Sequence, residues 1–123
     1  MVKTLSQYDE KLDQGSLLER LEGNQEFLNE VIQLFLGEAP HLIDAMRKAL
    51  QKGDMQELGR SAHSMKGAAS NFSPYGTARA ASQLEKDAKS GDVESAKTSL
   101  ATLEVVVERM LSQLLDMCQG SAK

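Results

Sequence analysis

Residues 54–72 read DMQELGRSAHSMKGAASNF, and apolar residues recur in this segment every three or four positions. That spacing places them on one face of an α-helix. The face comprises Met55, Leu58, Ala62, Met65, Ala69 and Phe72. Gly53 precedes the segment, and Asp54 has Glu57 three residues later, which is the pattern of a capping box at a helix start. The segment therefore predicts an amphipathic helix that buries one face.

Three further segments on either side show the same periodicity. They cover residues 24–52, 76–90 and 92–119. In the first of them the apolar positions are Leu28, Ile32, Phe35, Ala39, Leu42, Met46 and Ala49. Asn24 and Asp92 each follow a glycine and mark helix starts. Because short connections between long helices imply antiparallel neighbours, the sequence predicts an all-α fold, an antiparallel up-down four-helix bundle, as a single domain over residues 1–123.

Two details of this bundle are predicted from its N-terminal half. A short additional helix around Ser16 to Leu21 is expected to cap one end of the bundle. Pro40 lies inside the first long segment, and proline has no N–H for the helix ladder and crowds the preceding turn. We therefore expect a kink or a break near Gly37 to Pro40.

Composition limits the class of protein. The 123 residues are one domain's length, 41% are hydrophobic, and aromatic residues make up only 4%. A single cysteine excludes an intrachain disulfide and a thiolate zinc cage. No apolar run approaches the roughly 20 residues of a membrane span, and the amino end has no signal-peptide core, so we expect a cytoplasmic protein without a membrane partner. The net charge of −4 argues against nucleic acid as a partner.

The first of the two histidines, His41, does not indicate a metal site. Glu38 lies three residues before it, and Glu-x-x-His pairs ligate iron in carboxylate-bridged helical bundles. Such a site needs a second pair and further glutamates, and here Pro40 interrupts the only pair. We interpret His41 as a surface residue and expect neither a metal nor a cofactor.

The second histidine, His63, lies on the polar side of its predicted helix, about 130° from the apolar face. Gly59 and Gly67 flank it at i−4 and i+4, and Lys66 and Ser70 lie on the same side. Interior glycine weakens a helix by about 1 kcal/mol relative to alanine, so two of them beside one histidine invite an explanation. Either another molecule approaches His63 closely, or His63 is an ordinary exposed residue on a weakened helix.

The chemistry of this face suits a phosphoryl group. A neutral imidazole is a nucleophile near physiological pH, and a lysine one turn away can offset the charge of phosphoryl oxygens. Between Arg60 and Lys89 the chain has five Lys and Arg residues, including Arg79, and two acids, a local charge of +3; the remainder, nine against sixteen, carries −7. The stretch around His63 thus suits a negatively charged partner.

Residues 62–72, AHSMKGAASNF, resemble the signature of the histidine-containing phosphotransfer (HPt) domain family, whose phosphorylatable helix reads Ala-His-x-Leu-Lys-Gly followed by small residues. The similarity covers about residues 24–117. Ala81, Leu84 and Glu85 match the next helix of the family. Two departures are Ser73-Pro74, where the family commonly has Gly-Ala, and Met65, which replaces the usual leucine.

The resemblance implies a phosphorelay intermediate of two-component signalling. His63 would accept a phosphoryl group from a receiver-domain aspartyl phosphate and pass it to another receiver aspartate, while Lys66 would stabilise the phosphoryl group. The receiver would supply magnesium and most catalytic groups, so this chain would be a phosphocarrier and not an enzyme. Expected partners are receiver domains and a hybrid sensor histidine kinase, bound by a monomer. The expected partner-binding residues are Gly59, Arg60, Gly67, Ser70 and Arg79.

Three alternatives are weighed against this interpretation. A helical adaptor or dimerisation module would bind receivers without carrying phosphate, although His63, Lys66 and Gly67 are all present. The dimerisation segment of a sensor kinase usually has an acidic residue directly after its histidine, where this chain has Ser64. A hydrolase built on Cys118 lacks a histidine within reach by helix position.

Overall fold

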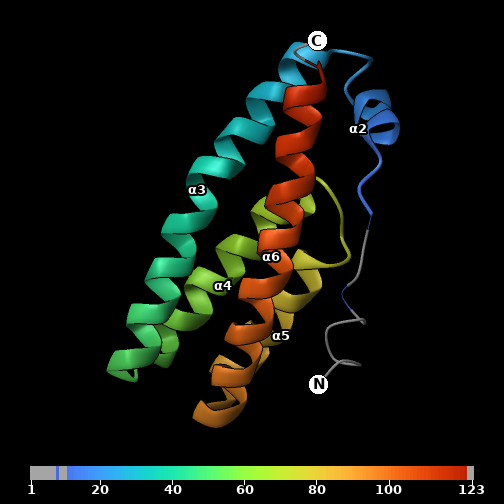
Figure 1. The fold of residues 1–123 in the computed structure, drawn as a ribbon. Helices are drawn as coiled ribbons and strands as arrows, with labels where there is room; N and C mark the ends of the chain where they lie inside the picture. The colour runs from blue at the N-terminus through green and yellow to red at the C-terminus, as the bar shows by residue number, and fades with distance from the viewer. Residues whose placement is uncertain (1–7, 9–10, 122–123) are drawn as a thin grey trace.

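The computed structural model describes residue 8 and residues 11–121; the ends of the predicted domain at residues 1–7, 9–10 and 122–123 lie outside the described residues. The helices are α2 (Gln14–Arg20), α3 (Gln25–Lys52), α4 (Met55–Ser70), α5 (Thr77–Ser90) and α6 (Val93–Ser121). Successive long helices run in opposite directions, and α6 packs against both α5 and α3 (Figure 1). The predicted all-α up-down four-helix bundle is confirmed.

Polar caps and glycines set the turns between the long helices. The side chains of Asn24, Asp54 and Asp92 each accept a hydrogen bond, 2.9 to 3.1 Å long, from the backbone N–H three residues further on. Gly53 and Gly91 have left-handed φ angles of 74° and 76°, which glycine adopts without steric cost. Each of these two glycines ends one helix directly before the cap of the next. The chain therefore reverses within a few residues, which makes neighbouring helices antiparallel.

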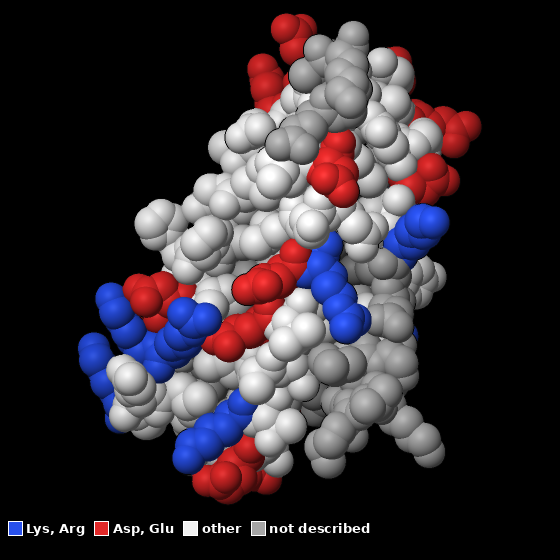
Figure 2. All heavy atoms as spheres, viewed as in Figure 1, with Lys and Arg blue, Asp and Glu red and all other residues white. Residues whose placement is uncertain are grey.

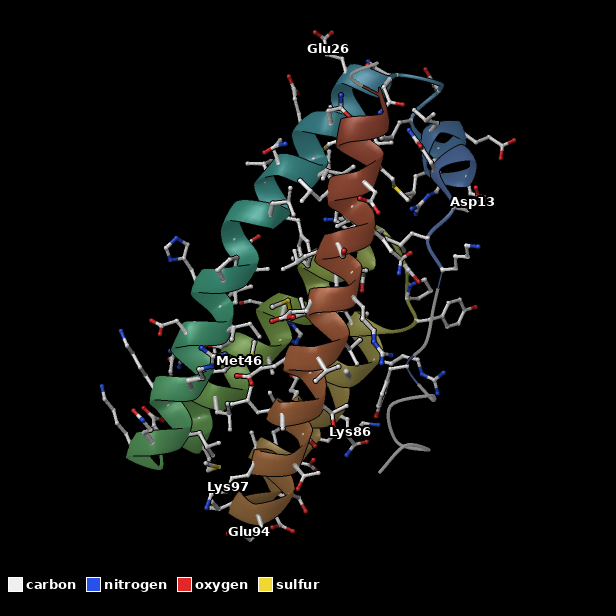
Figure 3. All side chains as sticks on the ribbon, in the orientation of Figure 1. Asp13, Glu26, Met46, Lys86, Glu94 and Lys97 are labelled. Atoms are coloured by element: carbon white, nitrogen blue, oxygen red, sulfur yellow. The ribbon has the colours of Figure 1, made fainter. Side chains whose placement is uncertain are left out.

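The core lies along the bundle axis, where all four long helices contribute apolar side chains. The largest fully buried side chains are Leu28, Ile32, Met46, Leu58, Met65, Leu84, Leu103, Met110, Leu114 and Thr77. Figure 3 shows Met46 on the inner side of α3. On that helix Ile43 is buried and Leu42 is only partly buried, so the buried face passes through Ile43 rather than the predicted Leu42.

α3 continues through Pro40. Within its described residues the helix runs unbroken from Gln25 to Lys52, so α3 has no break near Gly37 to Pro40, and a kink there stays a prediction. Proline removes one hydrogen bond of the ladder, but Ala39 and Ile43 on either side of it are buried against the rest of the bundle. This packing holds the backbone in helical geometry across the missing bond.

α2 covers one end of the bundle, as the predicted short additional helix. Leu17 is buried there, and the Arg20 guanidinium donates a 2.9 Å hydrogen bond to the backbone carbonyl of Asn71 after α4. Asp13 and Glu26 lie at this end, whereas Glu94 and Lys97 lie at the other (Figure 3). On the face shown in Figure 2, acidic side chains gather at the end with α2.

Candidate functional site

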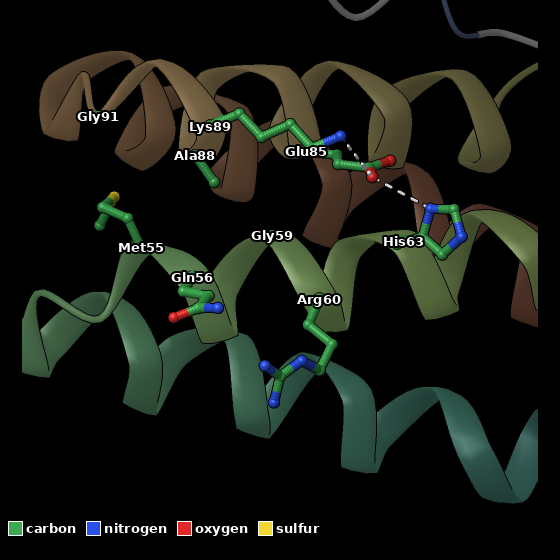
Figure 4. A pocket seen from close by; sticks show the side chains of 9 residues that line it. All are labelled: Met55, Gln56, Gly59, Arg60, His63, Glu85, Ala88, Lys89 and Gly91. Carbon is green, nitrogen blue, oxygen red and sulfur yellow. Dashed lines mark hydrogen bonds and ion pairs between the residues drawn. The ribbon is translucent and has the colours of Figure 1, made fainter.

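His63 projects from α4 toward solvent, and α5 holds one side of its ring. The side chain is 65% exposed. Its Nδ1 lies 3.0 Å from Oε2 of Glu85, which comes from α5, 22 residues later in the chain (Figure 4). The neighbouring Ala62 and Met65 are fully buried, so the helix is anchored on the opposite face. The ring is thus fixed on an exposed surface by one hydrogen bond to a second helix.

Glu85 is bound by three basic groups. Its side chain is only 13% exposed, and Lys66 Nζ lies 3.6 Å from Oε1 while Lys89 Nζ lies 3.5 Å from Oε2. Burial acts to raise the pKa of Glu85, but the charges of His63, Lys66 and Lys89 and the hydrogen bond from His63 outweigh it. The pKa of Glu85 therefore lies below its usual value, and the group is a carboxylate at neutral pH.

The ionised state of Glu85 determines which ring nitrogen of His63 carries the proton. A carboxylate can only accept hydrogen bonds, so Nδ1 must be the donor. In the neutral ring the other nitrogen, Nε2, then carries the lone pair. In Figure 4 this second nitrogen lies on the side of the ring away from Glu85. The fold therefore presents a nucleophilic nitrogen outward.

A groove of about 660 Å³ runs beside His63 between α4 and α5, and we call it the α4–α5 groove. It is lined by Met55, Gln56, Gly59, Arg60, His63, Glu85, Ala88, Lys89 and Gly91 (Figure 4). An alanine Cβ at Gly59 would lie 3.5 Å from the Cβ of Ala88, so the two helices approach closely along the groove.

The side chain of Arg60, which also lines the groove, forms an ion pair with Glu57 at 3.0 Å. That pairing directs Glu57 away from the Asp54 backbone, so only the Asp54 half of the expected capping box forms.

The surface on the other side of His63 is open. Gly67 lies one helical turn beyond it, and a Cβ added there would meet no atom within 4 Å. Ser70 follows on the same face, and its hydroxyl donates to the backbone carbonyl of Lys66 at 2.7 Å. Space above Gly67 is therefore not needed for packing within the bundle and is available to another molecule.

An apolar hollow begins at Ser70. It has a volume of about 540 Å³ and lies where α2, α3 and the end of α4 meet. Two of its lining residues on α3 are large and exposed, Phe27 at 47% and Leu34 at 72%. Ser70 lies seven residues after His63, which is about 10.5 Å along a helix. The hollow and His63 therefore fit beneath one partner of ordinary footprint.

The structure brings together most of the residues singled out in the sequence. Gly59 and Arg60 line the groove with His63, and Lys66 meets His63 through their shared contact with Glu85. Gly67 and Ser70 continue the same face of α4. Arg79 is exposed near the start of α5 and is not among the residues that line the groove. His41 is exposed on α3, and the described part of the chain contains no group of three or more His, Cys, Asp or Glu residues that could hold a metal ion.

Two residues of the site were missed by sequence reasoning, Glu85 and Lys89. Glu85 was named only as part of the resemblance, and it was otherwise counted as one of two acids in a stretch of net positive charge. The available signal was the short, alanine-rich apolar face of α5, which predicts close packing on α4. Four-residue spacing then places Glu85 and Lys89 one turn apart on one side of α5. Which side faces His63 depends on how the two helices pack.

Comparison with known proteins identifies the family. A family model described as Hpt domain matches residues 30–117, from within α3 to within α6. The chain therefore belongs to the Hpt domain family. Such domains are phosphocarriers that act with receiver domains and kinases in two-component phosphorelays. Searches of curated proteins and of solved structures find no match.

Among the helices of the described residues, none combines the length and the apolar character that a membrane span requires.

Proposed function

We propose that this chain is a phosphorelay intermediate in which His63 receives a phosphoryl group from the aspartyl phosphate of one receiver domain and transfers it to an aspartate of another. The observation that carries the proposal is the 3.0 Å contact between Nδ1 of His63 and Glu85. It leaves Nε2 as the unprotonated nitrogen of a neutral ring, and that nitrogen faces outward.

The transfer uses the Nε2 lone pair. Nε2 forms a bond to phosphorus while the bond from phosphorus to the aspartate oxygen breaks, and the aspartate leaves as a carboxylate. The proton on Nδ1 stays in place, so the phosphorylated ring is a cation. Glu85 stabilises this positive charge through the hydrogen bond it already makes. Transfer to the second receiver reverses these bond changes.

Lys66 stabilises the transferred group. Its ammonium lies 3.6 Å from Oε1 of Glu85 and its side chain is 38% exposed, so it can turn toward phosphoryl oxygens bound at His63. Phosphoryl transfer depends on positioning and on offsetting charge over three oxygens. Magnesium and the remaining catalytic groups are proposed to come from the receiver, as the resemblance to the HPt family implies.

The partner covers the face of α4 around His63. Contacts are proposed at Gly59, Arg60, Gly67, Ser70 and Arg79, on the basis of their exposure or their place around His63. A receiver would also reach the apolar hollow, where the large apolar side chains of Phe27 and Leu34 are exposed. We further propose that the chain acts as a monomer in the cytoplasm, where a hybrid sensor kinase is the source of the phosphoryl group.

The test is to mix the chain with a receiver that carries radiolabelled aspartyl phosphate and to follow the label. The chain should acquire label that is acid-labile and alkali-stable, as expected for phosphohistidine. His63→Gln should abolish it, whereas His41→Gln, which removes the other histidine from an exposed site on α3, should not. Label that persists in His63→Gln would overturn the assignment. A receiver that binds without transferring label would favour the adaptor function instead.

A further inference from the structure

We propose that Lys89 is a positioning residue that acts through Glu85. Its positive charge offsets the negative charge of that carboxylate. Glu85 can then orient the His63 ring without favouring the imidazolium form, in which both ring nitrogens are protonated. The inference rests on the proposed role of His63 as the nucleophile, and it adds a residue of α5 that forms an ion pair with Glu85.

The contact between His63 and Glu85 has two opposing effects on the reactivity of the ring. A carboxylate 3.0 Å from Nδ1 fixes the ring and the tautomer, but it also favours the imidazolium form, which is protonated on both nitrogens. An imidazolium has no lone pair on Nε2 and cannot attack phosphorus. An unopposed glutamate would therefore orient the ring but would also favour the form that cannot react.

Lys89 is placed to moderate this effect. Its Nζ lies 3.5 Å from Oε2, which is the same oxygen that accepts from His63, and Lys66 Nζ lies 3.6 Å from Oε1. Each oxygen of the carboxylate therefore has its own ammonium. The charged groups that contact Glu85 are His63 and Lys66 from α4 and Lys89 from α5. When Lys66 turns to the phosphoryl group, Lys89 remains on Glu85.

The contribution of Lys89 is limited by its exposure. The side chain of Lys89 is 74% exposed, while that of Glu85 is 13% exposed. Solvent therefore screens the charge of Lys89 more than the charge of Glu85, which weakens the ion pair. Pairs of this kind change protonation equilibria by roughly 0.2 to 0.7 of a pH unit. A shift of this size changes the ratio of neutral to protonated ring by about 1.6- to 5-fold, and it is readily measured.

The experiment is an NMR titration of the His63 ring in the unphosphorylated full chain, labelled with ¹⁵N-histidine. In Lys89→Gln the midpoint of protonation should rise by roughly 0.2 to 0.7 of a pH unit. Above the midpoint the proton should stay on Nδ1, because Glu85 is unchanged. Lys89→Arg should restore the parent midpoint. Lys86→Gln, which removes the same charge from a neighbouring exposed position on α5, should leave it unchanged.

A second background isolates the route through Glu85. In Glu85→Gln chains, the shift caused by Lys89→Gln should shrink, because no carboxylate holds the ammonium beside the ring. A full shift in that background, an equal shift in Lys86→Gln, or an unmoved midpoint in Lys89→Gln would each overturn the proposal. The titration needs no phosphate, so its outcome is independent of whether the chain accepts label. If it does, the pH profile of transfer should move with the midpoint.

Discussion

Nδ1 of His63 and Oε2 of Glu85 lie 3.0 Å apart and join α4 to α5 across 22 residues of sequence. The turn between the helices and their close packing, with Gly59 against Ala88, set this distance. The imidazole ring of His63 is thus oriented by the tertiary structure and not by its own helix. Substitutions that change a charge, the space around His63 or the helix packing are therefore expected to affect stability and phosphoryl transfer differently.

The ion pairs of Glu85 should make folding stability depend on pH. Because the pKa of Glu85 is lower in the folded chain than its usual value, its contribution is present above the unfolded pKa and is lost as pH falls through the folded pKa. The stability difference between the parent and Glu85→Gln should therefore shrink from about pH 5 to pH 3. Urea unfolding at several pH values measures it, and a constant difference would contradict the pKa assignment.

Gly67→Ala should raise folding stability and slow phosphoryl transfer. The added Cβ meets no atom within 4 Å, so the variant should be more stable by up to about 1 kcal/mol while transfer from a receiver slows, because the methyl group occupies space that the partner needs. Gly37→Ala is the matched control: this glycine also lies within a helix with open space at its Cβ. It should give similar stabilisation at the parent transfer rate. Equal rates in both variants would remove the steric role of Gly67.

Lys66→Ala should slow transfer on the order of ten-fold, because one cation is lost from the phosphoryl group. Helix content by circular dichroism should not change, since Lys66 contributes one partly exposed ion pair. Lys48→Ala, which removes an exposed lysine paired with Asp44 on α3, serves as control and should transfer at the parent rate. If Lys66→Ala transfers as fast as the control, the proposed role of Lys66 is wrong.

Leu34→Glu should weaken receiver binding if the apolar hollow is part of the interface. Leu34 is 72% exposed, so its replacement should cost little folding stability, whereas a charge in the hollow must be desolvated on binding. Calorimetric titration with the receiver should show a several-fold higher dissociation constant. Val105→Glu, an exposed position on α6, should bind as the parent does. Unchanged binding by Leu34→Glu would place the interface elsewhere.

Pro40→Ala should stabilise the chain by about 1 to 3 kcal/mol. The helix already continues through this exposed position, so alanine would restore the missing hydrogen bond without moving the backbone. The free energy of unfolding in urea measures the gain. A loss of stability would show that α3 depends on the proline ring at this point.

The bundle could be predicted from local signals, because its helix starts and apolar faces depend on neighbouring residues. Asn24, Asp54 and Asp92 cap helices through bonds to residues three positions away, which sequence spacing exposes directly. Of the predicted kink or break at Pro40, the break does not occur, because burial of the surrounding turns outweighs the local preference of proline. Packing of this kind depends on residues distant in sequence.

The site was only half predictable for the same reason. His63, Lys66, Gly59 and Gly67 share one helix, so their common face follows from helical geometry alone. Glu85 reaches the ring from α5, and the charge count along the chain includes Glu85 without placing it beside His63. The partner of Nδ1 had to come from the packed structure.

The hydrogen bond between His63 and Glu85 also has a consequence for synthesis. α4 leaves the ribosome before α5, so a nascent chain holds His63 for some time without the helix that orients its ring. We expect such a chain to be a poor phosphoryl acceptor until α5 docks. With His63 as the proposed acceptor, acceptance of a phosphoryl group would depend on completed folding, and unfinished or damaged copies would draw little phosphate.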